Sequence, residues 1–200
     1  MPIQIQTPLT SDAIQSLRVG DTVEITGPIY AARDAAHKRM LEALSRGESI
    51  PIDLKGGNLI YYVGPTPPRP GAVIGAAGPT TSMRMDAFCA GLIPHGLKAT
   101  MGKGGRGPEL RDLMRRHGAI YFLAVGGSGA LLSQHIKQAE VIAYEDLGTE
   151  AIRLLTVENF PAIVCNDVEG RDLLEEGKAK WARKPVPAGA AKAPLRNGGG

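Results

Sequence analysis

Four apolar runs in this chain each lead into a glycine-rich loop or a helical pattern, and this repeated junction restricts the fold most. The junctions are "ITGPIYAARDAAHKR" (25–39), "AVIGAAGPTTSMRMD" (72–86), "LKATMGKGGRG" (97–107) and "AIYFLAVGGSGALL" (119–132). Strand-like runs that alternate with helices are typical of α/β domains with buried strands. Because ligands bind at the carboxyl ends of such strands, we expect the four junctions to meet at one edge of a sheet.

The remaining pattern predicts one α/β domain with a strand-rich final third. Strands are expected at 2–9, 22–32, 58–64, 71–78, 97–105, 119–127, 139–146, 151–159 and 161–167. Helices are expected at 10–21, 33–47, 87–92, 108–118, 128–136 and 170–184. The domain is expected to span 1–184. Residues 185–200 contain mostly Pro, Ala and Gly with a few polar or charged residues, one valine and one leucine, and they are predicted to form a disordered tail.

Composition excludes several classes of protein. The net charge of +3 is too small to indicate nucleic-acid binding, and the aromatic content of 4% argues against base stacking. No apolar run approaches the ~18 residues of a membrane span, and "MPIQIQTPLT" lacks the apolar core of a signal peptide. We therefore expect a cytoplasmic protein. Cys89 and Cys165 lie far apart without metal-ligand spacing, so no metal site is predicted in this chain.

The junction "GPTTSMRMD" (78–86) combines hydroxyl side chains with an arginine at a helix start. Thr80, Thr81 or Ser82 can cap that helix, whose free N–H groups and dipole favour an anion. Thr80 and Arg84 are four residues apart, so they can lie on one side of the first turn. This combination suits a carboxylate or a phosphate. An ordinary helix cap with a solvated arginine is the alternative.

The junction "GPIYAARDAAHKR" (27–39) places Arg33 at another helix start, where its charge is unfavourable with the helix dipole. An anionic ligand would justify that arginine, and pairing with Asp34 is the alternative. His37 follows one turn later on the same face.

Two glycine-rich junctions complete the set. Lys103 stands between glycines in "MGKGGRG" (101–107), which lacks the spacing of a Walker loop and has a flexible turn as its alternative interpretation. "VGGSGALL" (125–132) can pack a helix tightly or form an anion nest, and packing is favoured. Two arginines and one lysine at one edge suit a dicarboxylate. Because no catalytic triad, metal cluster or carboxylate pair is evident, the chain resembles half of an active site.

The chain resembles the β subunit, or C-terminal domain, of class I iron–sulfur fumarate hydratases and the similar β subunit of L(+)-tartrate dehydratase. The resemblance rests on four ordered motifs: "GPIYAARDAAHKR" (27–39), "GPTTSMRMD" (78–86), "GKGG" (102–105) and "AVGGSGALL" (124–132). It covers roughly residues 1–184 and implies a swivelling β/β/α domain, with mixed sheets and helices packed on one side. It also implies a partner α subunit that holds a [4Fe–4S] cluster, whose open iron acts as a Lewis acid. Cys89 and Cys165 are then buried small hydrophobes.

The resemblance also implies residue roles. Arg33 and Arg84 would contact a substrate carboxylate, because an arginine supplies both charge and orientation. Thr80 would place a hydroxyl near the reacting carbon and is a candidate base, although a threonine hydroxyl needs help from neighbouring groups. Lys103 would contact the substrate and stabilise the negative charge that develops when a proton leaves carbon.

Three neighbouring residues complete these expectations. Asp86 begins the helix that follows Arg84 and is expected to hold that arginine in place. His37 is a candidate for indirect support of the site, although a single histidine is more often structural. Met83 departs from the small residue that the family often has there, but the spacing from Thr80 to Arg84 is kept.

The main hypothesis is a hydro-lyase β subunit that interconverts L-malate and fumarate and is active only with its α subunit. The nearest alternative is L(+)-tartrate as the substrate and oxaloacetate as the product. An alternative of another class is a non-catalytic module that binds anions or serves assembly.

Overall fold

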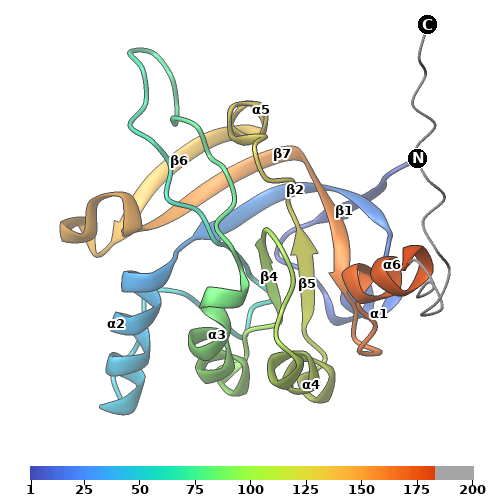
Figure 1. Cartoon of the computed structure of the whole chain (residues 1–200). Helices are drawn as coiled ribbons and strands as arrows, with labels where there is room; N and C mark the ends of the chain where they lie inside the picture. The colour runs from blue at the N-terminus through green and yellow to red at the C-terminus, as the bar shows by residue number, and fades with distance from the viewer. Residues whose placement is uncertain (183–200) are drawn as a thin grey trace, which may run out of the picture.

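A computed structural model describes residues 1–182, whose strands form one seven-stranded sheet (Figure 1). The strands are β1 (Ile3–Gln6), β2 (Thr22–Ala31), β3 (Leu59–Tyr61), β4 (Ala99–Gly102), β5 (Ile120–Leu123), β6 (Ile136–Ala143) and β7 (Ile152–Asn166). Strands β1 to β5 pair parallel with one another, whereas β7 pairs antiparallel with β2, β5 and β6. The predicted α/β class is confirmed. The predicted tail 185–200 and the domain end at 184 lie outside the described residues.

The long strand β7 closes the sheet. Along one edge it pairs with β2, from Ile163 opposite Thr22 to Arg153 opposite Ala31. Along its other edge it pairs with β5 and then with β6. The sequence predicted two strands here with a break before Pro161. The structure has one strand, because the irregularity is absorbed by a register shift in β2 and a positive φ of 49° at Asn159.

The sheet separates two hydrophobic cores, and the helices pack against it. They are α1 (Ser11–Ser16), α2 (Asp34–Ser45), α3 (Asp86–Leu92), α4 (Pro108–His117), α5 (Gly129–Gln134) and α6 (Leu173–Trp181), with 3₁₀ turns η1 (Met83–Met85), η2 (Ile93–His95) and η3 (Glu145–Glu150). Because successive strand side chains face opposite ways, Tyr61 and Phe122 join one cluster while Tyr62 and Tyr121 join the other. Helices α2, α3 and α4 lie together on the second cluster's side, as predicted, whereas Ile14 of α1 packs into the first (Figure 1).

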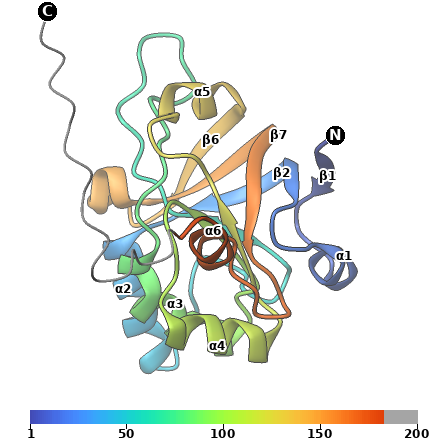
Figure 2. The same cartoon turned by 45° about the vertical axis from the view of Figure 1, so that its right-hand side comes forward.

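The strand predicted at 71–78 is wrong. Those residues belong to a loop between β3 and η1 that projects past α5 in both views (Figures 1 and 2). Prolines at 65, 67, 68 and 70 have no N–H to give to a ladder, and Gly71 has a positive φ of 80°. The apolar pattern of 72–77 therefore reflects packing of the loop, since Ala77 and Ile74 contact the first core.

The end of this loop instead inserts between β3 and β4. The Thr80 N–H donates to the Tyr62 carbonyl at 2.7 Å, and the Lys103 N–H donates to the Thr80 carbonyl at 3.0 Å. The Ser82 N–H then donates to the Lys103 carbonyl at 2.8 Å. Residues 80–82 are thus held by backbone hydrogen bonds at the carboxyl ends of β3 and β4.

A contact between two glycines fixes the returning loop. The Ala77 N–H donates to the Gly129 carbonyl at 3.0 Å, and a Cβ added at Gly129 would lie 2.8 Å from the Gly78 nitrogen. The packing interpretation of "VGGSGALL" is therefore confirmed at Gly129. Within residues 1–182, no helix is both long enough and apolar enough to span a membrane.

We expect Gly129→Ala to lower the free energy of unfolding by about 1–3 kcal/mol, because the new methyl group meets backbone that cannot easily move. Gly177→Ala is the matched control, since a Cβ there meets no heavy atom within 4 Å. It should instead stabilise helix α6 by about 0.5–1 kcal/mol. Urea unfolding of both variants measures the difference, and equal stability would contradict the Gly78–Gly129 contact.

Candidate functional site

The four predicted site residues gather at the carboxyl edge of the parallel strands. Arg33 lies just after β2, Lys103 follows β4, Thr80 lies beside the ends of β3 and β4, and Arg84 lies in η1. Parallel pairing of β2 with β3 and of β3 with β4 brings these ends together. Residues from three of the four junctions, 25–39, 72–86 and 97–107, therefore lie at one edge of the sheet, as expected.

Asp34 joins the two arginines. Its Oδ1 accepts hydrogen bonds from Arg84, at 2.9 Å from Nε and 2.8 Å from one terminal nitrogen, and its Oδ2 lies 3.4 Å from Arg33 Nε. Burial opposes ionisation of Asp34, but its own backbone N–H and the guanidinium groups of Arg84 and Arg33 lower the pKa of the carboxyl below its usual value. Guanidinium groups from two distant segments thus meet on one carboxylate.

Glu150 and Gly64 fix the direction of the Arg33 side chain. Glu150 Oε1 pairs with Arg33 at 3.0 Å, and Glu150 Oε2 accepts the Ala35 N–H at 2.7 Å. Glu150 therefore satisfies a free N–H in the first turn of α2 while it holds the arginine. A Cβ at Gly64 would lie 2.6 Å from Arg33 Nη1, so the side chain passes directly over the glycine backbone. The alternative of pairing with Asp34 is realised, and Glu150 is an additional partner that the sequence did not indicate.

Thr80 and Lys103 are neighbours through their backbones. The Lys103 N–H donates to the Thr80 carbonyl, and an isolated parallel bridge joins Thr81 to Lys103. The Lys103 residue is exposed, and its Cδ would lie 3.4 Å from a Cβ placed at Gly126. The lysine side chain therefore crosses the glycine turn that follows β5.

The expected contact between Asp86 and Arg84 is wrong. Asp86 Oδ1 lies 2.9 Å from Nε of Arg106, and its Oδ2 accepts the Gly107 N–H at 2.6 Å. Arg84 turns instead toward Asp34 on α2. Arg106 is 3% exposed, although nothing in the glycine-rich sequence around it predicts burial.

His37 is buried behind Arg33. Its Nδ1 lies 3.0 Å from the Arg33 carbonyl, which can only accept, so Nδ1 carries the proton. Its ring packs edge-on against Tyr62, at 5.4 Å between centroids. Burial lowers the pKa of His37 from 6.5 to about 4, and the ring is neutral at physiological pH. The histidine thus supports the backbone of Arg33 and its side chain does not face the open edge.

The cysteines do not resemble metal ligands. Cys89 and Cys165 are both buried free thiols, and burial raises the pKa of Cys165 to about 12 and that of Cys89 above its usual value. Among residues 1–182, no three His, Cys, Asp or Glu side chains form a group that could hold a metal ion. These residues therefore do not fit an iron–sulfur cluster.

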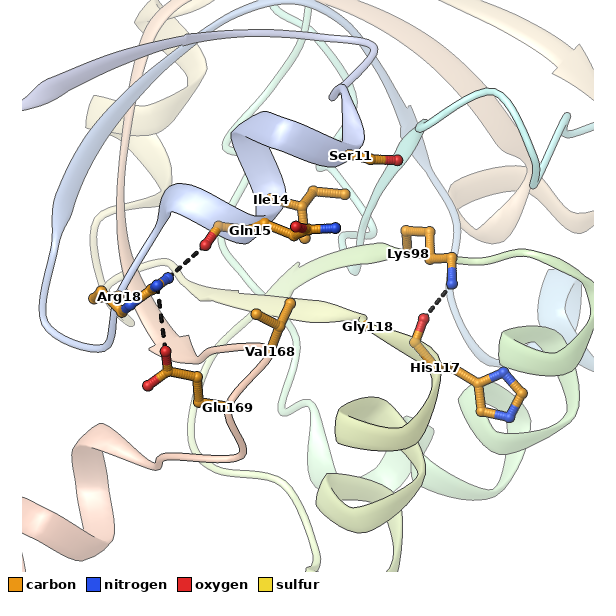
Figure 3. Close-up of a pocket in the computed structure, with 9 residues that line it drawn as sticks. All are labelled: Ser11, Ile14, Gln15, Arg18, Lys98, His117, Gly118, Val168 and Glu169. Atoms are coloured by element: carbon orange, nitrogen blue, oxygen red, sulfur yellow. Dashed lines mark hydrogen bonds and ion pairs between the residues drawn. The ribbon is translucent and has the colours of Figure 1, made fainter.

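A cavity of about 450 Å³ lies at the opposite edge, beside α1 and the amino-terminal ends of β4 and β5 (Figure 3). Arg18 pairs there with Glu169 at 3.2 Å, and the Lys98 amino group donates to the His117 carbonyl. None of the four predicted site residues lines this cavity. The candidate site is therefore the exposed carboxyl edge of the sheet, away from this cavity.

Comparison with known proteins finds the same similarity along almost the whole described chain. A family model described as the fumarase C-terminus matches residues 1–177. A Methanocaldococcus jannaschii protein provisionally named L(+)-tartrate dehydratase subunit beta is 37% identical over 182 residues, which is 88% of this chain and 93% of that relative. The anaerobic class I fumarate hydratase of Escherichia coli K12 is 38% identical over 160 residues, and fumarate hydratase 2 of Leishmania major is 37% identical over 157. The matches cover 79% and 78% of this chain but only 29% and 28% of those two longer relatives.

The free energy of unfolding should fall as the pH drops from 6.5 toward 4, because unfolded His37 takes up a proton that the folded ring does not. The slope from this residue is at most about 1.4 kcal/mol per pH unit. Urea unfolding at several pH values measures the slope, which should become shallower in His37→Gln. The same substitution at exposed His95 is the control. Identical slopes in wild type and His37→Gln would contradict the prediction.

Proposed function

Because the chain belongs to the fumarase C-terminus family, we propose that it is the β subunit of an iron–sulfur hydro-lyase that interconverts L-malate and fumarate. The observation that carries this proposal is the meeting of Arg33, Arg84, Thr80 and Lys103 at one sheet edge. Two guanidinium groups and one ammonium group suit a C4 dicarboxylate.

Arg33 and Arg84 bind one carboxylate of the substrate in this proposal. Asp34 holds both guanidinium groups in one place before the substrate arrives, which reduces the entropy lost on binding. The side chain of Arg84 is 52% exposed and can turn from Asp34 to a ligand. An exposed ion pair of this kind contributes only about 0–1 kcal/mol, so a substrate carboxylate can compete for the arginine.

Thr80 and Lys103 act on the reacting carbon in the proposal. Dehydration removes a proton from the carbon next to one carboxylate and hydroxide from the neighbouring carbon, so a double bond forms and one water leaves. Thr80 accepts the proton or passes it on, and Lys103 stabilises the negative charge on the adjacent carboxylate. Backbone hydrogen bonds join Thr80 and Lys103 side by side.

A partner α subunit is part of the same proposal. It would hold the [4Fe–4S] cluster and cover the exposed edge, where Met83 is 56% and Val125 is 59% exposed. The similarity over 93% of a relative provisionally named a β subunit supports the proposal of an α-subunit partner. The swivelling motion of the domain over its partner and the cytoplasmic location are proposed with it.

L(+)-tartrate is the second candidate substrate. The near full-length similarity to the protein provisionally named L(+)-tartrate dehydratase subunit beta favours it. Tartrate carries one hydroxyl more than malate, and a site that hydrogen-bonds that hydroxyl can discriminate strongly between the two. The arginine pair and the Thr80–Lys103 pair serve both substrates equally.

We expect the chain to form fumarate from L-malate only when it is combined with a cluster-bearing α subunit under anaerobic conditions. Ultraviolet absorbance of fumarate follows the reaction, with each subunit alone as a control and L-tartrate as the competing substrate. Preference for tartrate would replace the substrate and keep the mechanism. Activity on neither, with an intact cluster in the partner, would contradict the proposed function.

We expect Thr80→Val to lower kcat by about 100-fold or more, because it removes the hydroxyl proposed to move the proton. Thr81→Val is the matched control, since Thr81 is exposed and has no proposed role. Its kcat should stay within about twofold of wild type. Full turnover by Thr80→Val in the reconstituted pair would exclude Thr80 as the base.

A further inference from the structure

Arg106 lies buried beneath the two segments that carry the proposed catalytic groups. Its side chain is 0% exposed, although it belongs to a run with glycines at 102, 104, 105 and 107. Glycines give this run many accessible backbone conformations. A single buried arginine in such a segment therefore needs a specific set of partners to be stable there.

The first partner is Asp86, which opens helix α3 directly after η1 and Arg84. Asp86 Oδ1 lies 2.9 Å from Arg106 Nε, and Asp86 Oδ2 accepts the Gly107 N–H at 2.6 Å. One carboxylate thus forms an ion pair with the arginine side chain and accepts a hydrogen bond from the backbone just after it. This contact ties the start of α3 to the glycine-rich segment 102–107.

Two aromatic rings also lie against the arginine. The guanidinium carbon lies 5.3 Å from the Tyr62 ring centre and 5.1 Å from the Tyr121 ring centre, within cation–π distance of both. The Tyr121 hydroxyl is in turn hydrogen-bonded to Ser82 Oγ at 2.9 Å and to the Gly104 carbonyl at 2.8 Å. The ring that stacks on Arg106 therefore also joins the 80–82 segment to the glycine-rich segment.

We propose that Arg106 is a positioning residue that sets the separation between Lys103 on one segment and Thr80 and Arg84 on the other. The inference rests on the proposed function, in which those side chains act on one substrate. Arg106 does not reach the substrate in this arrangement, because it is buried under the segments themselves. It acts through Asp86 and Tyr121, which bond both segments.

A purely stabilising role is a poor explanation for this arginine. Replacing a buried ion pair by apolar side chains of similar size is often neutral or stabilising, so burial of Arg106 and Asp86 is weak evidence for stability alone. A planar guanidinium can pair with Asp86 and lie over two aromatic rings at once, which a compact ammonium group does less well. These contacts of Arg106 suit a residue that fixes the geometry of the two segments.

The test compares Arg106→Ala and Arg106→Lys with the matched control Arg111→Lys. Arg111 lies in helix α4, is partly buried and pairs through its side chain with Asp172 at 3.1 Å. It bonds the segment 102–107 through its backbone N–H, which donates to the Gly107 carbonyl at 3.0 Å and is kept in Arg111→Lys. Hydrogen exchange, read by mass spectrometry on the folded full-length chain, reports the segment 102–107. We expect exchange of the Lys103 and Gly107 amides to rise by about 10-fold or more in both Arg106 variants and to stay unchanged in Arg111→Lys.

Kinetics of the reconstituted pair separate positioning from folding. We expect Arg106→Ala to lower kcat on the order of 100-fold, as small displacements of catalytic groups do, while KM changes by less than about threefold. Added guanidinium ion should restore part of that kcat without changing the circular dichroism of the chain. Arg106→Lys should be intermediate, and Arg111→Lys should retain wild-type kcat.

Several results would overturn the inference. Unchanged exchange at 102–107 in Arg106→Ala would show that the arginine does not hold the segment. Equal losses of kcat in Arg106→Lys and Arg111→Lys, or a loss that follows only the folded fraction, would show a general effect on stability. If the wild-type pair acts on neither substrate, the proposed function fails, and the exchange experiment alone decides whether Arg106 fixes the two segments.

Discussion

The pairing of β7 with β2 along one edge, and with β5 and β6 along the other, is the constraint on which the rest of the structure depends. It closes the sheet, so β2, β3, β4 and β5 cannot slide independently. Their carboxyl ends then lie together, and each delivers a loop to the same edge. Strand pairing therefore brings the site residues to one edge, independently of contacts between their side chains.

Two carboxylates organise the charged groups within that edge. Asp34 gathers Arg33 and Arg84 at the surface, where substrate can reach the arginines, whereas Asp86 holds Arg106 below it. The Arg84–Asp34 pair, whose arginine is 52% exposed, can open at little cost. The buried Arg106–Asp86 pair is expensive to break, because an unpaired charge would remain in the interior. Arg84 can therefore exchange Asp34 for a ligand while Arg106 and Asp86 keep their geometry. An open edge of this kind suits an active site that a partner subunit completes.

Much of this was predictable from strand-to-loop junctions, because local apolar runs and glycines record where strands end. The junctions singled out Arg33, Thr80, Arg84 and Lys103 as candidates, although the strand expected before Thr80 is absent. The prediction of a strand at 71–78 is wrong because its apolar residues lie in a loop that packs on the first core. The pattern of a short apolar run does not distinguish such a loop from a strand. The partners of Arg84 and Asp86 were not predictable, since Asp34 and Arg106 approach them through tertiary packing alone.

The proposal that Arg33 and Arg84 bind one substrate carboxylate is tested most directly by a double-mutant cycle. The cycle measures malate turnover by the reconstituted pair with Arg33→Lys, Arg84→Lys and the double variant. If both guanidinium groups bind the same substrate carboxylate, their losses in kcat/KM are not independent. The claim predicts a coupling free energy of about 1 kcal/mol or more between them. Losses that add within about 0.5 kcal/mol would show that the two arginines act separately and would contradict it.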